Sequence, residues 1–277
     1  MKDLKHLIYF ESLLENANNE LVQKAQAEGN LALGYTCYHV PEALLNVGNC
    51  FSVRLRAPNT GSIDIATYYM SNYTCEFARA LVERGIEGGY QFLDAMIGVD
   101  ACSMMNRAME HFEILKVNDK PNFFVTHCDI PYKITDYTLD SYVKQMRIHV
   151  LDKLTEVYGV DTSDAAIRQA VAEHNEVCSI VSEMAEMRKA ENPVITGYEF
   201  HVINLVTYVC PKALILPYLR ETLKELKKRK PDEKSPFRAR VAIVGSEIDD
   251  PQLTKLIEGC GALVVSDRYC FGSTPGR

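Results

Sequence analysis

The chain has 277 residues, of which 47% are hydrophobic, 24% charged and 9% aromatic, a profile typical of a folded globular protein and not of a disordered, collagen-like or coiled-coil chain. Thirty Lys and Arg residues against 37 Asp and Glu give a formal net charge of −7. A negative chain repels a phosphate backbone, so we expect no nucleic-acid partner. At about 150 residues per domain, the length predicts two domains.

The N-terminal residues 1–29 predict an amphipathic helix, because charged and apolar residues alternate there. They contain neither the continuous apolar core nor the small-residue cleavage site of a secretory signal. The most apolar stretch, residues 201–219, is interrupted by Asn204, Pro211, Lys212 and Pro217. We interpret it as two buried helical pieces and expect no membrane span and a cytoplasmic location.

Residues 30–137 form the first predicted α/β domain, because short β-rich runs alternate with helical ones. This alternation is typical of a parallel sheet built from β-α-β units. We expect strands at 31–37, 50–55, 92–99 and 122–127, and helices at 41–47, 75–84 and 104–112.

Residues 138–237 form a predicted helical segment and linker. We expect one amphipathic helix over 138–158, a second between the Asp161–Ser163 cap and Asn192, and two more at 197–208 and 212–229. The charged, proline-containing stretch KELKKRKPDEKSPFR then marks a domain boundary.

The final residues, 238–277, begin a second α/β domain. The pattern predicts strands at 238–245 and 261–267 with a helix that starts at Asp249-Asp250-Pro251. Two strands and one helix make a poor independent core. We therefore expect this second parallel-sheet domain to be incomplete and the chain to be a fragment or a truncated gene product.

Nine cysteines occur in the chain, and none belongs to a C-x-x-C pair, which excludes zinc ribbons, thioredoxin motifs and ferredoxin-type cluster motifs. Four are expected just beyond strand ends, where parallel sheets hold ligands: Cys37, Cys102, Cys128 and Cys270. Cys75 is expected to open a helix, where backbone N–H groups favour a thiolate. Four others are interpreted as small buried apolar residues: Cys50, Cys178, Cys210 and Cys260. Thiolate ligands without nearby histidine pairs favour an iron–sulfur cluster, with zinc as the alternative.

An ordered series of motifs runs from residue 34 to residue 273. It consists of GYTCYHVPEALLNVGNCFSVRL, Cys75 in SNYTCEFARA, Cys102 in IGVDACSMMNRAME, residues 122–137, PVITGYEF, and VAIVGSEIDDPQLTKLIEGCGALVVSDRYCFGS. The series resembles the 2-hydroxyacyl-CoA dehydratase and benzoyl-CoA reductase family, as a subunit of the dehydratase D-component.

The resemblance implies two α/β domains around a helical segment, with a [4Fe-4S] cluster held between them by three cysteines. The family positions match Cys75, Cys102 and Cys270 and select them over Cys37 and Cys128. The implied activity is that of a hydro-lyase, which eliminates water from a 2-hydroxyacyl-CoA by radical chemistry. The implied partners are a homologous subunit in a heterodimer, an ATP-driven iron–sulfur activator that supplies the electron, and the acyl-CoA substrate.

Three other functions remain open at this point. The chain is alternatively a benzoyl-CoA-reductase-like or double-cubane-cluster reductase, or a non-catalytic or degenerate subunit. A nucleotide-binding α/β protein is a further alternative, although VAIVGSEIDD contains no G-x-G-x-x-G.

Several other residues are candidates for contact with substrate. Tyr35, His39 and Glu42 are candidates to face the cleft, His127 to carry a proton, and Arg268 to meet the cluster or an anionic substrate. A surface or capping role is the alternative for each. The basic run 227–230 is either a site for CoA phosphates or the exposed end of a helix, where cations are favourable.

Overall fold

The computed structural model describes residues 3–57, 60–232, 237–245 and 247–273. Residues 233–236 of the predicted charged boundary and the last four residues of the predicted second domain lie outside the described residues. The chain divides into two compact units. The four-stranded unit is Ala17–Ala172, and the two-stranded unit combines Met1–Asn16 with Glu173–Arg277.

A parallel sheet in the order β2-β1-β3-β4 forms the centre of the four-stranded unit. Its strands are β1 (Leu31–Tyr35), β2 (Cys50–Arg54), β3 (Ala95–Val99) and β4 (Phe124–Cys128). Every residue of β2 and β3 is buried, as is all of β1 except Leu31. Parallel strands covered on both faces are expected to read as continuous apolar runs, and this explains why the sequence located them. The predicted α/β class with parallel pairing is confirmed.

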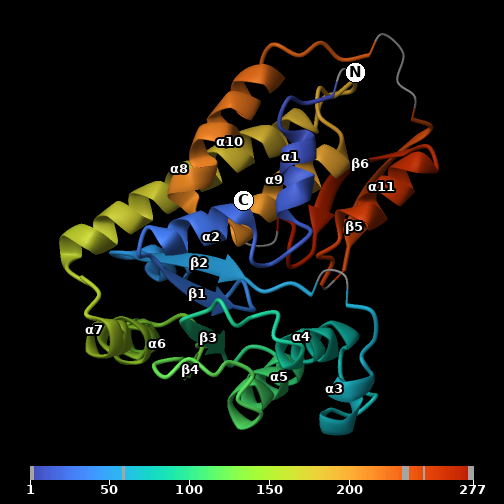
Figure 1. Ribbon diagram of the computed structural model, residues 1–277. Coiled ribbons are helices and arrows are strands. Elements are labelled where there is room, and N and C mark those ends of the chain that lie inside the picture. The colour runs from blue at the N-terminus through green and yellow to red at the C-terminus, as the bar shows by residue number, and fades with distance from the viewer. Residues whose placement is uncertain (1–2, 58–59, 233–236, 246, 274–277) are drawn as a thin grey trace. The chain divides into compact units, whose positions relative to one another are not determined.

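Helices surround this sheet in the four-stranded unit (Figure 1). They are α2 (Glu20–Ala27), η1 (Glu42–Asn46), α3 (Asp64–Tyr69), α4 (Glu76–Ile86), α5 (Ser103–Ile114), α6 (Asp136–Met146), η2 (Arg147–Leu151) and α7 (Asp152–Tyr158). The helix expected over 41–47 is only the 3-10 turn η1. The sequence missed α3, since six largely exposed residues carry no apolar periodicity.

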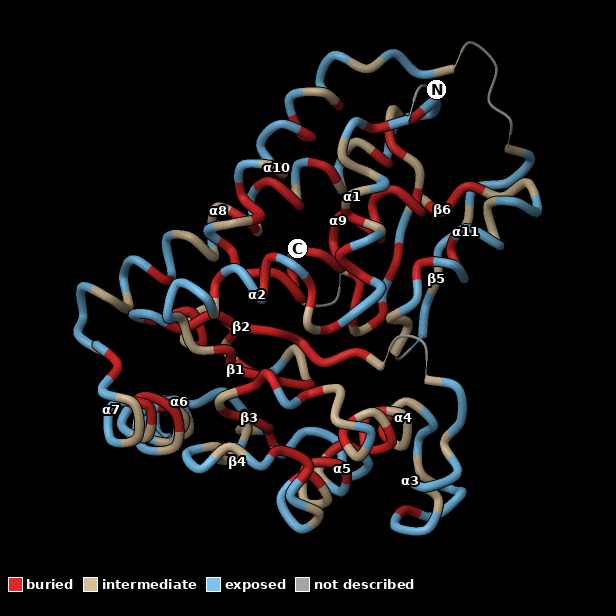
Figure 2. The backbone as a smooth tube through the Cα atoms, in the orientation of Figure 1, coloured by how far each residue is buried: buried red, intermediate tan, exposed pale blue. Residues whose placement is uncertain are grey.

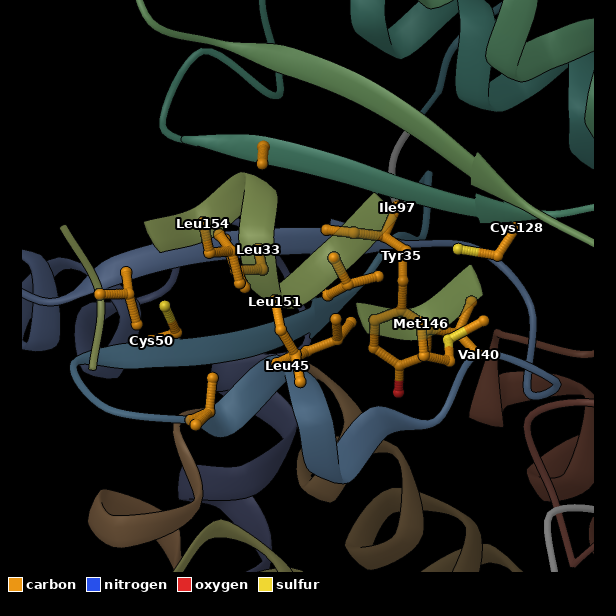
Figure 3. Packing of buried hydrophobic residues seen from close by; sticks show 14 of the residues in the cluster. Leu33, Tyr35, Val40, Leu45, Cys50, Ile97, Cys128, Met146, Leu151 and Leu154 are labelled. Carbon is orange, nitrogen blue, oxygen red and sulfur yellow. The ribbon is translucent and has the colours of Figure 1, made fainter. Parts of the chain in front are cut away.

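The helix predicted over 138–158 forms as the run α6-η2-α7, in which η2 is a π-helical segment. It ends where predicted, because Gly159 adopts the left-handed conformation (φ 68°) that glycine tolerates at a helix end. Its buried side packs against one face of the sheet (Figure 3). Tyr35, Ile97 and Leu151 meet in this core, where the strand residues alternate in and out with the period of two of a pleated strand.

The two-stranded unit holds a parallel pair with helices around it. Its elements are α1 (Leu7–Leu13), the later part of α8 (Asp164–Met187), α9 (Gly197–Val209), α10 (Lys212–Leu226), β5 (Ala239–Val244), α11 (Pro251–Gly259) and β6 (Ala262–Arg268). Strands β5 and β6 pair in parallel, with a register shift between Val241 and Ala242. Asp250 caps α11 by accepting a hydrogen bond from the Gln252 backbone N–H at 2.9 Å.

Helix α9 is buried along its whole length (Figure 2). Together with the start of α10 it accounts for the apolar stretch 201–219, so the prediction of two helical pieces is confirmed. Within the described ranges, no helix combines the length and the apolar character that a membrane crossing needs.

The N-terminal segment differs from its prediction as one amphipathic helix over 1–29. It contains α1 and α2, which belong to different units. The Asn19 side chain accepts hydrogen bonds from the backbone N–H groups of Leu21 and Val22, both at 3.1 Å. Asparagine is a favoured N-cap, so a new helix begins there although the charge pattern continues.

Candidate functional site

Cys75 and Cys102 occupy equivalent positions in the four-stranded unit. Each is the N-cap residue of a helix, Cys75 of α4 and Cys102 of α5. The Cys75 carbonyl accepts the first helical hydrogen bond from Arg79 at 3.1 Å, and the Cys102 carbonyl accepts from Asn106 at 2.9 Å. Both residues are exposed. The sequence therefore placed the two thiols correctly: one opens a helix, and the other follows a strand.

Neither cysteine side chain makes a capping hydrogen bond. Elsewhere in the chain, Asn19, Thr135, Thr196 and Asp250 do cap their helices. The first N–H groups of a helix carry a partial positive charge, which favours an anion close by. This partial positive charge stabilises an anionic sulfur at the N-cap, so both positions suit a cysteine that binds a metal.

Cys270 lies in the two-stranded unit, two residues beyond the end of β6. It is half-buried, and its neighbours Tyr269 and Phe271 are fully buried. This position after a strand also agrees with the prediction. Because Cys270 and the other two thiols belong to different units, their convergence on one cluster remains a prediction.

The chemistry of these three residues fits an iron–sulfur cluster. Thiolates are the ligands that such clusters use, and two of the three side chains are accessible at helix starts. Among the residues that the structure describes, no group of three or more His, Cys, Asp or Glu side chains forms a metal site.

Cys128 does not lie beyond a strand end, so this prediction from the sequence is wrong. It is the last residue of β4, not a residue beyond it, and is 1% exposed within the sheet core (Figure 3). Burial, together with the nearby Asp129 carboxylate, raises the pKa of its thiol to about 11. Cys37 lies two residues beyond β1 as expected and is half-buried against the same core.

The four cysteines interpreted as buried apolar residues do not all behave alike. Cys50 and Cys210 are buried, and burial with the nearby Asp94 raises the pKa of the Cys50 thiol to about 12. Cys178 is half-buried, 3.4 Å from the His174 imidazole Nε2. The prediction is wrong for Cys260, which is exposed at the C-cap of α11.

The candidate substrate contacts are dispersed within the four-stranded unit. The Tyr35 side chain is in the core and Glu42 is buried, accepting a hydrogen bond from the Ser52 hydroxyl at 3.3 Å. His39 is exposed and its ring lies against Tyr38. The half-buried His127 packs against Gly98. Tyr35 and Glu42 are thus parts of the packed interior.

Arg268 and the basic run 227–230 belong to the two-stranded unit. Arg268 is exposed at the end of β6. Lys227 pairs with Glu183 at 2.7 Å, and Arg229 pairs with Glu199 at 2.8 Å. Since α10 ends at Leu226 and two of the four cations meet carboxylates, the arrangement favours the helix-end interpretation of the run.

Sequence reasoning missed a set of polar residues around Cys270. Asn204 and Tyr208 of α9 donate hydrogen bonds to the turn that carries this cysteine, and Arg188 pairs with Asp267 just before it. One feature of the sequence could have indicated this set: Asn204 is a buried polar residue within a strongly apolar helix. In the sequence, Asn204 indicated only that the apolar stretch is not a membrane span.

Taken together, the units describe an α/β protein whose parallel sheets place cysteines just beyond strand ends and at helix starts. The chain belongs to the family described as 2-hydroxyglutaryl-CoA dehydratase, D-component, whose family model matches residues 37–277. The family resemblance drawn from the sequence is confirmed.

Three curated proteins illustrate the relationship. The chain is 20% identical over 269 residues to the (R)-phenyllactyl-CoA dehydratase beta subunit of Clostridium sporogenes, covering 97% of this chain and 70% of that protein. It is 21% identical over 245 residues to a benzoyl-CoA reductase subunit of Thauera aromatica, covering 86% and 61%. It is 22% identical over 208 residues to the beta subunit of (R)-2-hydroxyglutaryl-CoA dehydratase of Acidaminococcus fermentans, covering 74% and 54%. The chain therefore spans only part of the length of each relative.

Proposed function

We propose that this chain is the iron–sulfur subunit of a 2-hydroxyacyl-CoA dehydratase and that Cys75, Cys102 and Cys270 hold a [4Fe-4S] cluster. The observation that carries the proposal is the pair of exposed cysteines at the N-caps of α4 and α5, both without a side-chain cap. All three cysteines lie within the matched range 37–277. By contrast, Cys50 and Cys128 are buried thiols with raised pKa values, so they are poorly suited to act as thiolate ligands.

The proposed reaction explains why such a cofactor is needed. Water loss from a 2-hydroxyacyl-CoA removes a β-proton that the thioester does not acidify, which is unfavourable for acid–base catalysis alone. When bound on three thiolates, a [4Fe-4S] cluster supplies one-electron chemistry and keeps one iron free of protein ligands. The contribution of this chain is to hold the cluster: the N-terminal N–H groups of α4 and α5 offset the negative charge that the thiolates bring.

We propose three partners: a homologous subunit in a heterodimer, an ATP-dependent iron–sulfur activator and the acyl-CoA substrate. The first is supported by the names of the three relatives, each of which is described as one subunit of its enzyme. We also propose a cytoplasmic location, since none of the nine cysteines forms a disulfide and reduced thiols are typical of a reducing compartment.

A second candidate function is reduction instead of dehydration. It is favoured by one observation, the similarity to a benzoyl-CoA reductase subunit. A reductase that carries a double-cubane cluster is another form of this candidate. A subunit without catalytic activity is the alternative that is not an enzyme. Iron content well above about four per chain would favour the double-cubane form. Turnover of an aromatic acyl-CoA, with none of a 2-hydroxyacyl-CoA, would favour the reductase.

The test is iron and acid-labile sulfide per chain after anaerobic purification, for the parent and for Cys75→Ser, Cys102→Ser and Cys270→Ser. Cys260→Ser is the matched control, because Cys260 is exposed but is not a proposed ligand. We expect about four of each per chain in the parent and the control, with a large loss in each of the three variants. A parent without iron, or variants that keep it, would refute the proposal.

A further inference from the structure

The chain after β6 makes a tight turn that presents Cys270. The Gly272 backbone N–H donates to the Tyr269 carbonyl oxygen at 3.0 Å. Tyr269 is 2% exposed and Phe271 is 0% exposed. The Phe271 ring meets Tyr208 edge-on, and the Tyr269 ring meets His201 in the same manner. The residues on both sides of Cys270 are therefore anchored in the interior, while Cys270 itself is only half-buried.

Helix α9 holds the backbone of this turn by side-chain hydrogen bonds. Asn204 Nδ2 donates to the Phe271 carbonyl oxygen at 2.8 Å and to the Gly272 carbonyl oxygen at 3.1 Å. The Tyr208 hydroxyl donates to the same Gly272 oxygen at 3.1 Å. Residues 204 and 208 are four apart, so they project from one side of the helix. Both are buried, and buried hydrogen bonds are costly to lose because water does not replace the partner.

A buried ion pair adjoins the start of the turn. Asp267 Oδ2 accepts from Arg188 Nη1 at 2.7 Å, and the two side chains are 1% and 4% exposed. Asp267 Oδ1 accepts from the Ser273 backbone N–H at 2.6 Å, which spans the turn from its start to its end. The Arg188 guanidinium also stacks over the Phe200 ring at 3.7 Å, which fixes its orientation.

Glycine is required at position 272 by the closeness of this packing. A Cβ atom there would overlap Asp267 Oδ1 and would lie 2.9 Å from the Tyr269 ring. Asp267 is held by its ion pair with Arg188, and Tyr269 is buried. The packing around the turn therefore leaves no room for a side chain at position 272.

We propose that Asn204, Tyr208 and the Arg188–Asp267 pair are positioning residues, which hold the 269–273 turn so that the Cys270 thiol is fixed for cluster ligation. This inference rests on the proposed function, which assigns Cys270 as a cluster ligand. Its physical basis is preorganisation: a thiol on an ordered turn binds without the entropic cost of ordering that turn. None of the four residues contacts the cluster in this proposal; each acts through the backbone of the turn.

The first experiment measures the reactivity of Cys270 in cluster-free protein. Iodoacetamide labelling is followed by mass spectrometry at Cys270 and, as an internal reference, at the exposed Cys260 of the same unit. Tyr208→Phe keeps the ring and removes the hydroxyl that donates to Gly272, so the fold should persist. We expect the alkylation rate of Cys270, relative to that of Cys260, to rise roughly five-fold. This is the increase in the fraction of molecules with an open turn when one hydrogen bond of typical net strength is lost. Asn204→Leu should give a larger rise.

Tyr198→Phe is the matched control. It removes the hydroxyl of a tyrosine on the same helix, which bonds Glu11 and Gln252 and not the turn. The control should leave the Cys270 rate unchanged, and circular dichroism should show the same helix content in all variants. An equal rise in Tyr198→Phe and Tyr208→Phe would show general loosening of α9 and would overturn the proposal.

The second experiment measures iron release to a chelator from protein purified anaerobically with its cluster. We expect Tyr208→Phe and Asn204→Leu to release iron several-fold faster than the parent and Tyr198→Phe. If iron is held in Cys270→Ser, the ligand assignment of the proposed function fails. If iron depends on Cys270 but both the alkylation and the release rates are unchanged in Tyr208→Phe and Asn204→Leu, the positioning proposal alone fails.

Discussion

Replacing Arg229 should destabilise the two-stranded unit strongly, because it leaves a buried carboxylate without its cation. Arg229 Nη2 and Nη1 donate to the two Glu199 carboxylate oxygens at 2.8 and 2.9 Å, and the side chains are only 8% and 6% exposed. Nη1 also donates to the Val194 carbonyl oxygen at 2.9 Å. Breaking a buried ion pair from one side costs about 3–5 kcal/mol. Arg229→Met should therefore lower the melting temperature by roughly 10 °C.

The assay is thermal and urea unfolding followed by circular dichroism, with Lys228→Met as the control. Lys228 is the exposed neighbour of Arg229 in the same basic run, so its loss should change the free energy of unfolding by no more than about 0.5 kcal/mol. The double variant Arg229→Met with Glu199→Leu should cost less than the sum of the two single variants, because no unpaired charge remains. Equal midpoints for Arg229→Met and Lys228→Met would refute the argument from buried pairing.

Three further predictions concern a glycine, a carboxylate and the cysteine thiols. Gly197→Ala should cost about 1–3 kcal/mol in urea unfolding, since the new Cβ would lie 2.6 Å from a backbone oxygen of β6; an unchanged midpoint would contradict this packing. Hydrogen bonds from His6 and Lys5 lower the pKa of the Glu221 carboxyl from 4.5 to about 2. The contribution of this carboxylate to folding stability is therefore complete above pH 4.5 and is lost as the pH falls toward 2. Urea midpoints at pH 6 and pH 3 should therefore fall less in Glu221→Gln than in the parent; parallel curves would exclude a contribution from this carboxylate. Iodoacetamide at pH 8 should label Cys102 in the folded protein but Cys50 and Cys128 only after unfolding. The reason is that burial raises the pKa values of the Cys50 and Cys128 thiols to about 12 and 11. Labelling of all three cysteines at one rate would contradict the described core.

Much of the secondary structure was determined by short-range signals. The strands of the four-stranded unit are apolar runs whose residues pair with the backbone of a neighbour, and the helix ends follow from local chemistry such as Gly159 after α7 and Asp250 before α11. For the same reason, the positions of Cys75 and Cys102 at helix starts followed from the sequence. These features depend on residues within a few positions of one another, which a linear pattern records.

Only the tertiary structure decided which thiols are buried and how Cys270 is held. Cys128 and Cys260 both stand at the end of an element, yet Cys128 is buried in a sheet core and Cys260 is exposed. The hydrogen bonds from Asn204 to the turn at 270 join residues 67 and 68 positions apart. Such contacts depend on how helices pack against strands. The local spacing of residues does not predict them, because a buried polar group bonds residues that the fold brings close and not its neighbours in the sequence.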